Sequence, residues 1–125
     1  MRTIERRRRR ATLVTQALCY QLEACCEDGR IHAMVVADRD GLPLASSGDP
    51  SACDEVAASM VHVAARTHEF SGTLFGNGRR WDVEMRKVPV DHGDLFVCAV
   101  GGSPEQRQRQ LVRGARGAQR ILTVA

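Results

Sequence analysis

The residues with the clearest capacity for chemistry are two aspartates in the segment VVADRDGLPLASSGD, residues 35–49. Asp38 and Asp40 have the carboxylates that bind metal ions or act as bases. A calcium loop needs further oxygen ligands at alternate positions and a closing glutamate, which the following Ser-Ser-Gly does not supply. The segment is instead typical of a tight turn, because Gly41 tolerates positive φ and aspartate side chains hydrogen-bond turn backbone. We therefore predict a β-hairpin, whose second strand Pro43 places at a sheet edge.

Five cysteines are candidate nucleophiles and metal ligands, and no two of them have Cys-x-x-Cys spacing. An odd number without such a pair is typical of reduced thiols in a cytoplasmic protein. Cys25 and Cys26 beside His32 make a poor zinc site, because adjacent cysteines are poor tetrahedral chelators. We expect Cys53 on the buried side of a helix and Cys98 inside a central strand, where a thiol stays protonated. The sequence therefore predicts no metal, no cofactor and no catalytic residue.

Two histidines in the middle of the chain are the remaining candidate bases. We expect His62 and His68 on the exposed side of a helix, and no partnered nucleophile occurs at a recognised spacing. The segment GNGRR, residues 76–80, precedes a strand-like run rather than a helix, which makes it a poor nucleotide-binding loop. We therefore predict that the chain is not an enzyme.

Charge is distributed unevenly along the chain. Residues 1–10 hold six arginines and one glutamate, a charge of +5, and residues 105–125 hold five arginines and one glutamate, a charge of +4. Because the net charge is +3, the middle of the chain carries about −6. An acidic partner would therefore meet the terminal segments first. The arginine run is equally typical of a solvated helix start or tail, and Lys87 as the sole lysine indicates a general bias towards arginine.

The length of 125 residues predicts one domain. No apolar run is long enough for a transmembrane helix or a signal-peptide core, so we expect a cytoplasmic protein. We divide the chain into a basic N-terminal extension, residues 1–10, and a single domain, residues 11–125.

Hydrophobic periodicity and turn residues predict three helices and five strands in the order α-β-β-α-β-β-β-α. The second helix begins either with Asp49 before Pro50 or with Ser51 and Asp54. The predicted elements are a helix over 11–27, strands over 31–38 and 42–46, a helix ending near 68, strands over 73–75, 79–88 and 95–100, and a helix from 103.

In this order the chain resembles the roadblock family, which is related to the dynein light chains of that name and has many bacterial members. The resemblance rests on AMVVADRDGLPLASSGD before a helix, on the three-strand meander ending LFVCAVGG, and on the closing amphipathic helix. It covers nearly the whole chain after Arg10. It implies an α/β fold of the α+β sandwich type, also called roadblock/profilin-like: a five-stranded antiparallel sheet with the first and third helices on one face and the second on the other.

The resemblance also implies a function. Roadblock proteins are homodimers or heterodimers that bind Ras-like small GTPases or assemble motor and signalling complexes, and they are not enzymes in their own right. We therefore expect a homodimer that regulates a Ras-like small GTPase as an activating protein or effector platform, or one that acts as a scaffold without a GTPase. We name as candidate GTPase contacts His62, Arg66, Arg79 and Arg80.

Roadblock dimers pair their third strands edge to edge and pack their second helices together. The resemblance therefore implies a dimer interface in which small residues let two helices approach, although these are equally ordinary helix residues. The implied interface residues are Ala58, Val61, Ala65, Thr73, Leu74 and Phe75.

The implied fold also predicts a basic face, because it places the first and last helices together. That face would bind an acidic protein segment, anionic lipid headgroups or nucleic acid; five aromatic residues leave little for base stacking, so nucleic acid is the less favoured ligand. Its residues would be Arg6, Arg7, Arg8, Arg9 and Arg10 from the first helix, and Arg109, Arg113, Arg116 and Arg120 from the last.

Overall fold

The computed structural model describes residues 2–76, 78–91 and 93–124. The element order is the predicted one. Its helices and strands are α1 (Arg2–Gly29), β1 (Ala33–Ala37), β2 (Pro43–Gly48), α2 (Pro50–Ala64), β3 (Glu69–Gly76), β4 (Arg79–Val90), β5 (Gly93–Val100) and α3 (Pro104–Val124).

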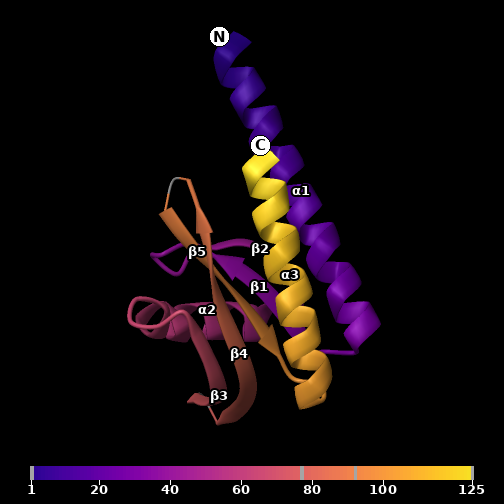
Figure 1. Cartoon of the computed structure of the whole chain (residues 1–125), viewed down its shortest axis with the longest axis vertical. Helices are drawn as coiled ribbons and strands as arrows, with labels where there is room; N and C mark the ends of the chain where they lie inside the picture. The colour runs from indigo at the N-terminus through magenta and orange to yellow at the C-terminus, as the bar shows by residue number, and fades with distance from the viewer. Residues whose placement is uncertain (1, 77, 92, 125) are drawn as a thin grey trace.

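The molecule has three layers, with one sheet between two layers of helices (Figure 1). All strand pairs are antiparallel, in the order β2-β1-β5-β4-β3, so β2 and β3 are the edges. The helices α1 and α3 run antiparallel, side by side, on one face of the sheet, and α2 crosses the other face (Figure 1). This confirms the predicted fold class, including the edge position of the strand that begins at Pro43.

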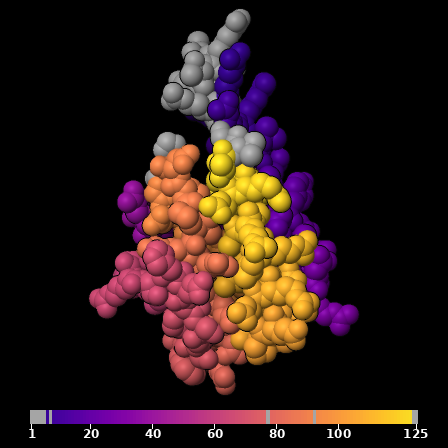
Figure 2. All heavy atoms as spheres, viewed as in Figure 1, coloured from indigo at the N-terminus to yellow at the C-terminus, as the bar shows by residue number. Residues whose placement is uncertain are grey.

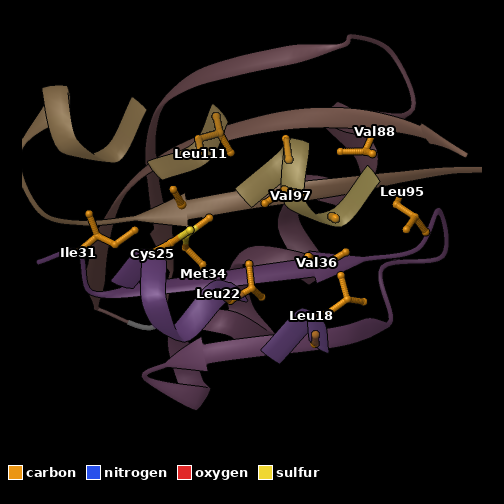
Figure 3. Packing of buried hydrophobic residues seen from close by; sticks show 14 residues of the cluster. Leu18, Leu22, Cys25, Ile31, Met34, Val36, Val88, Leu95, Val97 and Leu111 are labelled. Atoms are coloured by element: carbon orange, nitrogen blue, oxygen red, sulfur yellow. The ribbon is translucent and has the colours of Figure 1, made fainter. Parts of the chain in front are cut away.

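The inner strand β1 is buried on both faces, as the weak alternation of its sequence predicts. Met34 and Val36 face the α1/α3 layer, where they pack against Leu18, Leu22 and other apolar side chains (Figure 3). Val35 points the opposite way, towards the residues under α2. Each fully buried side chain of this size contributes about 1.5–3 kcal/mol relative to exposure, so the sheet is held from both sides.

The boundary between α2 and β3 differs from the prediction. We expected the helix to reach residue 68 and the strand to begin at 73, but α2 ends at Ala64 and β3 begins at Glu69. The reason is tertiary: Phe70 and Leu74 both pack against the cluster under α2, which keeps the chain extended from Glu69 onwards. Local helix propensity in residues 65–68 does not compensate for that burial.

The basic N-terminal segment is part of α1, which is continuous from Arg2 to Gly29. The first turns of α1 extend past the C-terminal end of α3 (Figure 1). Whether residues 1–10 act as a functional unit separate from 11–125 stays a prediction.

Candidate functional site

The Asp-Arg-Asp-Gly corner is a structural turn. One carboxylate oxygen of Asp38 accepts hydrogen bonds from the backbone N–H groups of Asp40, at 2.9 Å, and Leu42, at 3.0 Å. Gly41 has φ +83°, the left-handed region that favours glycine. A side chain there would also lie 3.2 Å from the Cβ of Val61 on α2. The corner therefore joins β1 to β2, as predicted, and the Asp38 carboxylate is used within the turn. The corner also packs on α2.

The two thiols singled out as nucleophiles are buried in the cluster under α2. Burial raises the pKa of both Cys53 and Cys98. The Cys53 sulfur lies 3.5 Å from the carbonyl oxygen of Met34 and 3.5 Å from that of Ser47, and its single S–H can donate to either. A thiol with a raised pKa and no access to solvent is a poor nucleophile, so neither residue forms a catalytic site.

The residues weighed as zinc ligands do not converge. Cys25 lies in the core cluster beneath α1, whereas His32 points to Asp49. The Cys26 sulfur is 3.9 Å from the carbonyl oxygen of Ser47, and burial raises its pKa to about 11. Within the part of the chain that the structure describes, no group of three or more histidine, cysteine or acidic side chains is arranged to hold a metal ion.

A network of side chains at the start of α2 went unrecognised in the sequence. The His32 Nε2 lies 3.1 Å from a carboxylate oxygen of Asp49, and the imidazole stacks on the Trp81 indole with 5.4 Å between ring centroids. The indole N–H donates to Glu55 on α2 at 2.7 Å. The guanidinium carbon of Arg79 is 5.9 Å from the Trp81 ring centroid, within cation–π range. The network ties the beginning of α2 to β1 and β4.

Asp49 is both part of this network and the N-cap of α2. Its other carboxylate oxygen accepts from the Ser51 backbone N–H at 2.9 Å, and Pro50 follows at the first helical turn. This selects the first of the two predicted helix starts. The hydrogen bond from His32, and then those from backbone N–H groups, hold the pKa of Asp49 below its ordinary value. Among the described residues no hydroxyl or thiol bonds to His32, so the pair lacks the nucleophile of a catalytic triad.

The predicted dimer residues lie on and beside α2 and along β3. Ala58 lines a groove of about 230 Å³ with Leu74 and Phe75, while Val61 and Ala65 line a second groove of about 310 Å³ towards β5. Phe75 is 79% exposed. Strand alternation turns Thr73 to the other face of the sheet, where its hydroxyl donates to Asp82 at 3.0 Å.

Within the described residues β3 pairs with β4 alone, so one side of its backbone has no strand partner. The surface around α2 thus combines small side chains, an exposed phenylalanine and a free strand edge. Such an edge is a template for pairing with another strand.

The candidate GTPase contacts form two separate groups rather than one site. His62 and Arg66 are exposed at the end of α2. Arg79 and Arg80 are exposed at the start of β4. Arg79 lies near the Trp81 ring, on the side of the sheet that α2 covers, whereas Arg80 lies 3.5 Å from Asp82, on the opposite face. A single partner would have to span the length of α2 to reach both groups.

The predicted arginine stripe of α3 exists but is partly neutralised. Its four residues, Arg109, Arg113, Arg116 and Arg120, line one groove of about 780 Å³ along the outer side of the helix. Arg113 donates to Asp28 of α1 at 2.7 Å, which raises the pKa of the guanidinium, and Arg109 lies 3.3 Å from Glu105. Among the described side chains, Arg116 and Arg120 have no such carboxylate.

The arginines of α1 are exposed where their side chains are described, namely at Arg6, Arg8, Arg9 and Arg10; the Arg7 side chain lies outside the described residues. Figure 2 shows α3, in yellow and orange, along one face of the molecule, with α1, in indigo and purple, beside it. Over the described residues, no helix combines the length and apolar character that crossing a bilayer requires.

Sequence reasoning also missed a buried arginine. Arg107 was counted with the basic helix, yet it is only 8% exposed and donates to the carbonyl oxygens of Gly101 and Gly102 at 3.0 Å each. The signal was present in part, because paired glycines that end a strand leave carbonyl groups to be satisfied. The identity of the donor depends on how α3 packs.

No protein-family model and no curated protein sequence matches the chain. Solved structures do match it. The gliding protein MglB from Thermus thermophilus superposes with a TM-score of 0.71 at 16% sequence identity, covering 90% of this chain and 93% of that one. MglB from Myxococcus xanthus gives a TM-score of 0.61 at 10% identity, covering 86% of this chain and 88% of that one.

A roadblock/LC7 domain from Streptomyces avermitilis matches as well, with a TM-score of 0.56 at 12% identity over 83% of this chain and 96% of that domain. Identities this low establish the fold alone. Together with the strand order and the placement of the three helices, these matches show that the chain has the roadblock fold of the MglB type.

Proposed function

We propose that the chain is a non-enzymatic homodimer that regulates a Ras-like small GTPase. The observation that carries the proposal is the likeness to the Thermus thermophilus MglB structure over nine tenths of the chain, with a TM-score of 0.71. The resemblance of the sequence to the roadblock family, whose members bind such GTPases, supplies the partner class. A cytoplasmic location is part of the proposal, in keeping with five cysteines that are all free.

The surface around α2 and β3 supports the homodimer. A two-fold axis would bring two copies of the same strand edge together and pack α2 against its counterpart. Ala58 and Ala65 are exposed and small, which permits close helix approach, and Phe75 is a large apolar side chain available for burial. One of the similar structures is an MglB with a tetrameric arrangement, so assembly through this fold has a precedent.

Regulation of a GTPase does not require a reactive group from this chain. A regulator can reshape the GTPase's own site, or place an arginine beside the phosphates in trans. Arg66, Arg79 and Arg80 are exposed and able to serve in the second way. The buried, protonated state of Cys53 and Cys98 supports a role without catalysis by the chain itself.

The test is affinity purification of the tagged full chain from a lysate of its own cells. Two samples of the lysate are compared, one supplemented with a non-hydrolysable GTP analogue and one with GDP. We expect a Ras-like GTPase to be recovered preferentially in one nucleotide state. With the purified pair, phosphate release separates the roles: acceleration indicates an activating protein, and binding without acceleration indicates an effector platform.

Matched variants locate the contact. We expect Arg79→Ala/Arg80→Ala or His62→Ala/Arg66→Ala to weaken GTPase binding, and Arg109→Ala on the opposite helix layer to leave it unchanged. Recovery of other proteins but no GTPase in either nucleotide state would contradict the proposal. It would favour the alternative, a scaffold subunit of a signalling or motor complex.

A further inference from the structure

The outer face of the α1/α3 layer is divided into a neutral end and a basic end. At the neutral end, Arg109 and Arg113 are next to Glu105 and Asp28. Towards the other end, α1 has no acidic residue between Arg6 and Leu22 and α3 has none after Glu105. The carboxylates nearest to that end of α3 are on the sheet side, where Asp38, Asp91 and Asp94 line a groove with Leu122 and Thr123. We define the basic end as the exposed side chains Arg6, Arg8, Arg9, Arg10, Leu13, Tyr20, Arg116 and Arg120.

Packing between the helices places these side chains on neighbouring turns. The Gln21 side chain donates to the Arg113 carbonyl oxygen at 3.4 Å and lies against Gly117. Because α1 and α3 run antiparallel, Tyr20 is therefore level with the turn of α3 that carries Arg116 and Arg120. The inner sides of both helices are buried against the sheet, so the outer sides face away from it together.

Two of the exposed large apolar side chains belong to this end. Leu13 is 64% exposed and Tyr20 is 69% exposed. Spaced seven residues apart, they share one stripe of α1 with Arg6, seven residues earlier, and with Arg9. This stripe is about 20 Å long at 1.5 Å per residue. The stripe thus has basic side chains in its first half and apolar side chains in its second half.

We propose that the basic end docks the protein on an anionic phospholipid membrane surface. A cluster of four to eight arginines on a helix with exposed apolar residues is the chemistry that recognises such lipids. The guanidinium groups pair with phosphates, while Leu13 and the amphipathic Tyr20 ring enter the headgroup region. At the neutral end the guanidinium groups of Arg109 and Arg113 are already paired with carboxylates, so the molecule docks by the basic end of the layer.

The apolar pair is what favours a membrane over nucleic acid. Non-specific binding to duplex DNA is supplied almost entirely by cationic side chains that neutralise phosphates, which would leave Leu13 and Tyr20 without a role. A membrane uses both kinds of side chain. The proposal stands on the charge and exposure of α1 and α3 and is independent of the GTPase proposal, which concerns α2 and β3.

Flotation of the full chain with lipid vesicles tests the membrane proposal. We compare vesicles of phosphatidylcholine alone with vesicles that also contain phosphatidylglycerol, across a salt titration, and measure the partition coefficient. We expect binding to the anionic vesicles only. Arg116→Gln/Arg120→Gln should lower the partition coefficient roughly thirtyfold, and Leu13→Ser/Tyr20→Ser by about tenfold. The matched control Arg109→Gln/Arg113→Gln, on the neutral end, should change it less than threefold, since those charges are already paired.

All substituted side chains are exposed, and thermal melting of each variant checks that it folds. Absence of binding to anionic vesicles at low salt overturns the proposal. Equal binding to neutral and anionic vesicles overturns it too. Tighter binding to a labelled DNA duplex than to vesicles at the same salt, unaffected by Leu13→Ser/Tyr20→Ser, would identify nucleic acid as the ligand instead.

Discussion

The Asp49 carboxylate makes two interactions: it caps the N-terminus of α2 and it pairs with His32. Its pKa is held below the ordinary value by the His32 hydrogen bond and by backbone N–H groups. A group whose pKa is lower in the folded state stabilises the fold above its unfolded pKa, near 3.9, and loses that contribution as pH falls through the folded value.

Asp49→Asn keeps an oxygen for the cap but removes the charge. We expect a lower melting temperature than that of the parent at pH 7, and a difference that shrinks as the pH falls from 5 to 3. Thermal melts across that range measure it. A difference that stays constant down to pH 3 would contradict the linkage.

Arg107 offers a stability prediction of a different kind. Its guanidinium is buried and bonds two carbonyl groups at the glycine turn between β5 and α3. We expect Arg107→Met to reduce the free energy of unfolding by about 1–3 kcal/mol, because two buried acceptors lose their donor. Arg109→Met, at an exposed pair, should cost under about 0.5 kcal/mol. Urea denaturation of both variants is the measurement, and equal losses would refute the structural role of Arg107.

At the scale of elements, the close approach of β1 and β2 sets a steric limit. Gly48 has φ +90°, and a Cβ there would collide with the backbone oxygen of His32. Gly78 also has positive φ, +74°, but nothing lies within 4 Å of its Cβ position. We expect Gly78→Ala to cost about 1–2 kcal/mol of conformational strain and Gly48→Ala to cost clearly more. Similar losses in urea denaturation would mean that β1 and β2 separate easily.

The elements show what sequence could and could not predict. The hairpin corner at Asp38 and Gly41 was predictable because its hydrogen bonds join residues at most four apart. The stacking of His32 on Trp81 was not, since it depends on two strands that are separated by β5 in the sheet. The prediction of where α2 ends was wrong for the same reason. Packing of Phe70 against the cluster under α2 makes the chain extended at an earlier residue than local helix propensity indicates.

The arginine stripe of α3 was predictable in part. A 3.6-residue period was enough to align its four arginines, and the structure places all four in one groove. The period could not reveal that Asp28 and Glu105 neutralise two of them, because Asp28 reaches Arg113 from a different helix.

At the scale of the whole molecule, the homodimer proposal makes a direct prediction. Multi-angle light scattering of the full chain at tens of micromolar should give twice the 13.7 kDa chain mass. Ala58→Glu and Val61→Glu should each raise the dissociation constant on the order of a hundredfold, because two-fold symmetry buries two unpaired charges at once.

Gln119→Glu, on the exposed side of α3, is the matched control and should leave the dimer intact. A strict monomer for the unsubstituted chain would remove the basis of the proposed assembly. Thermal melting of each variant separates loss of dimerisation from loss of folding.

The placement of α2 and the α1/α3 layer on opposite faces of the sheet has a consequence for a dimer joined through β3 and α2. A two-fold axis perpendicular to the sheet keeps both α2 helices on one side and therefore both basic ends on the other. Two attachment points would then face the same bilayer, and the second contact becomes intramolecular, with a high effective concentration. Retention on the membrane would rise steeply near the dimer dissociation constant, so that the abundance of the protein itself would control where it resides.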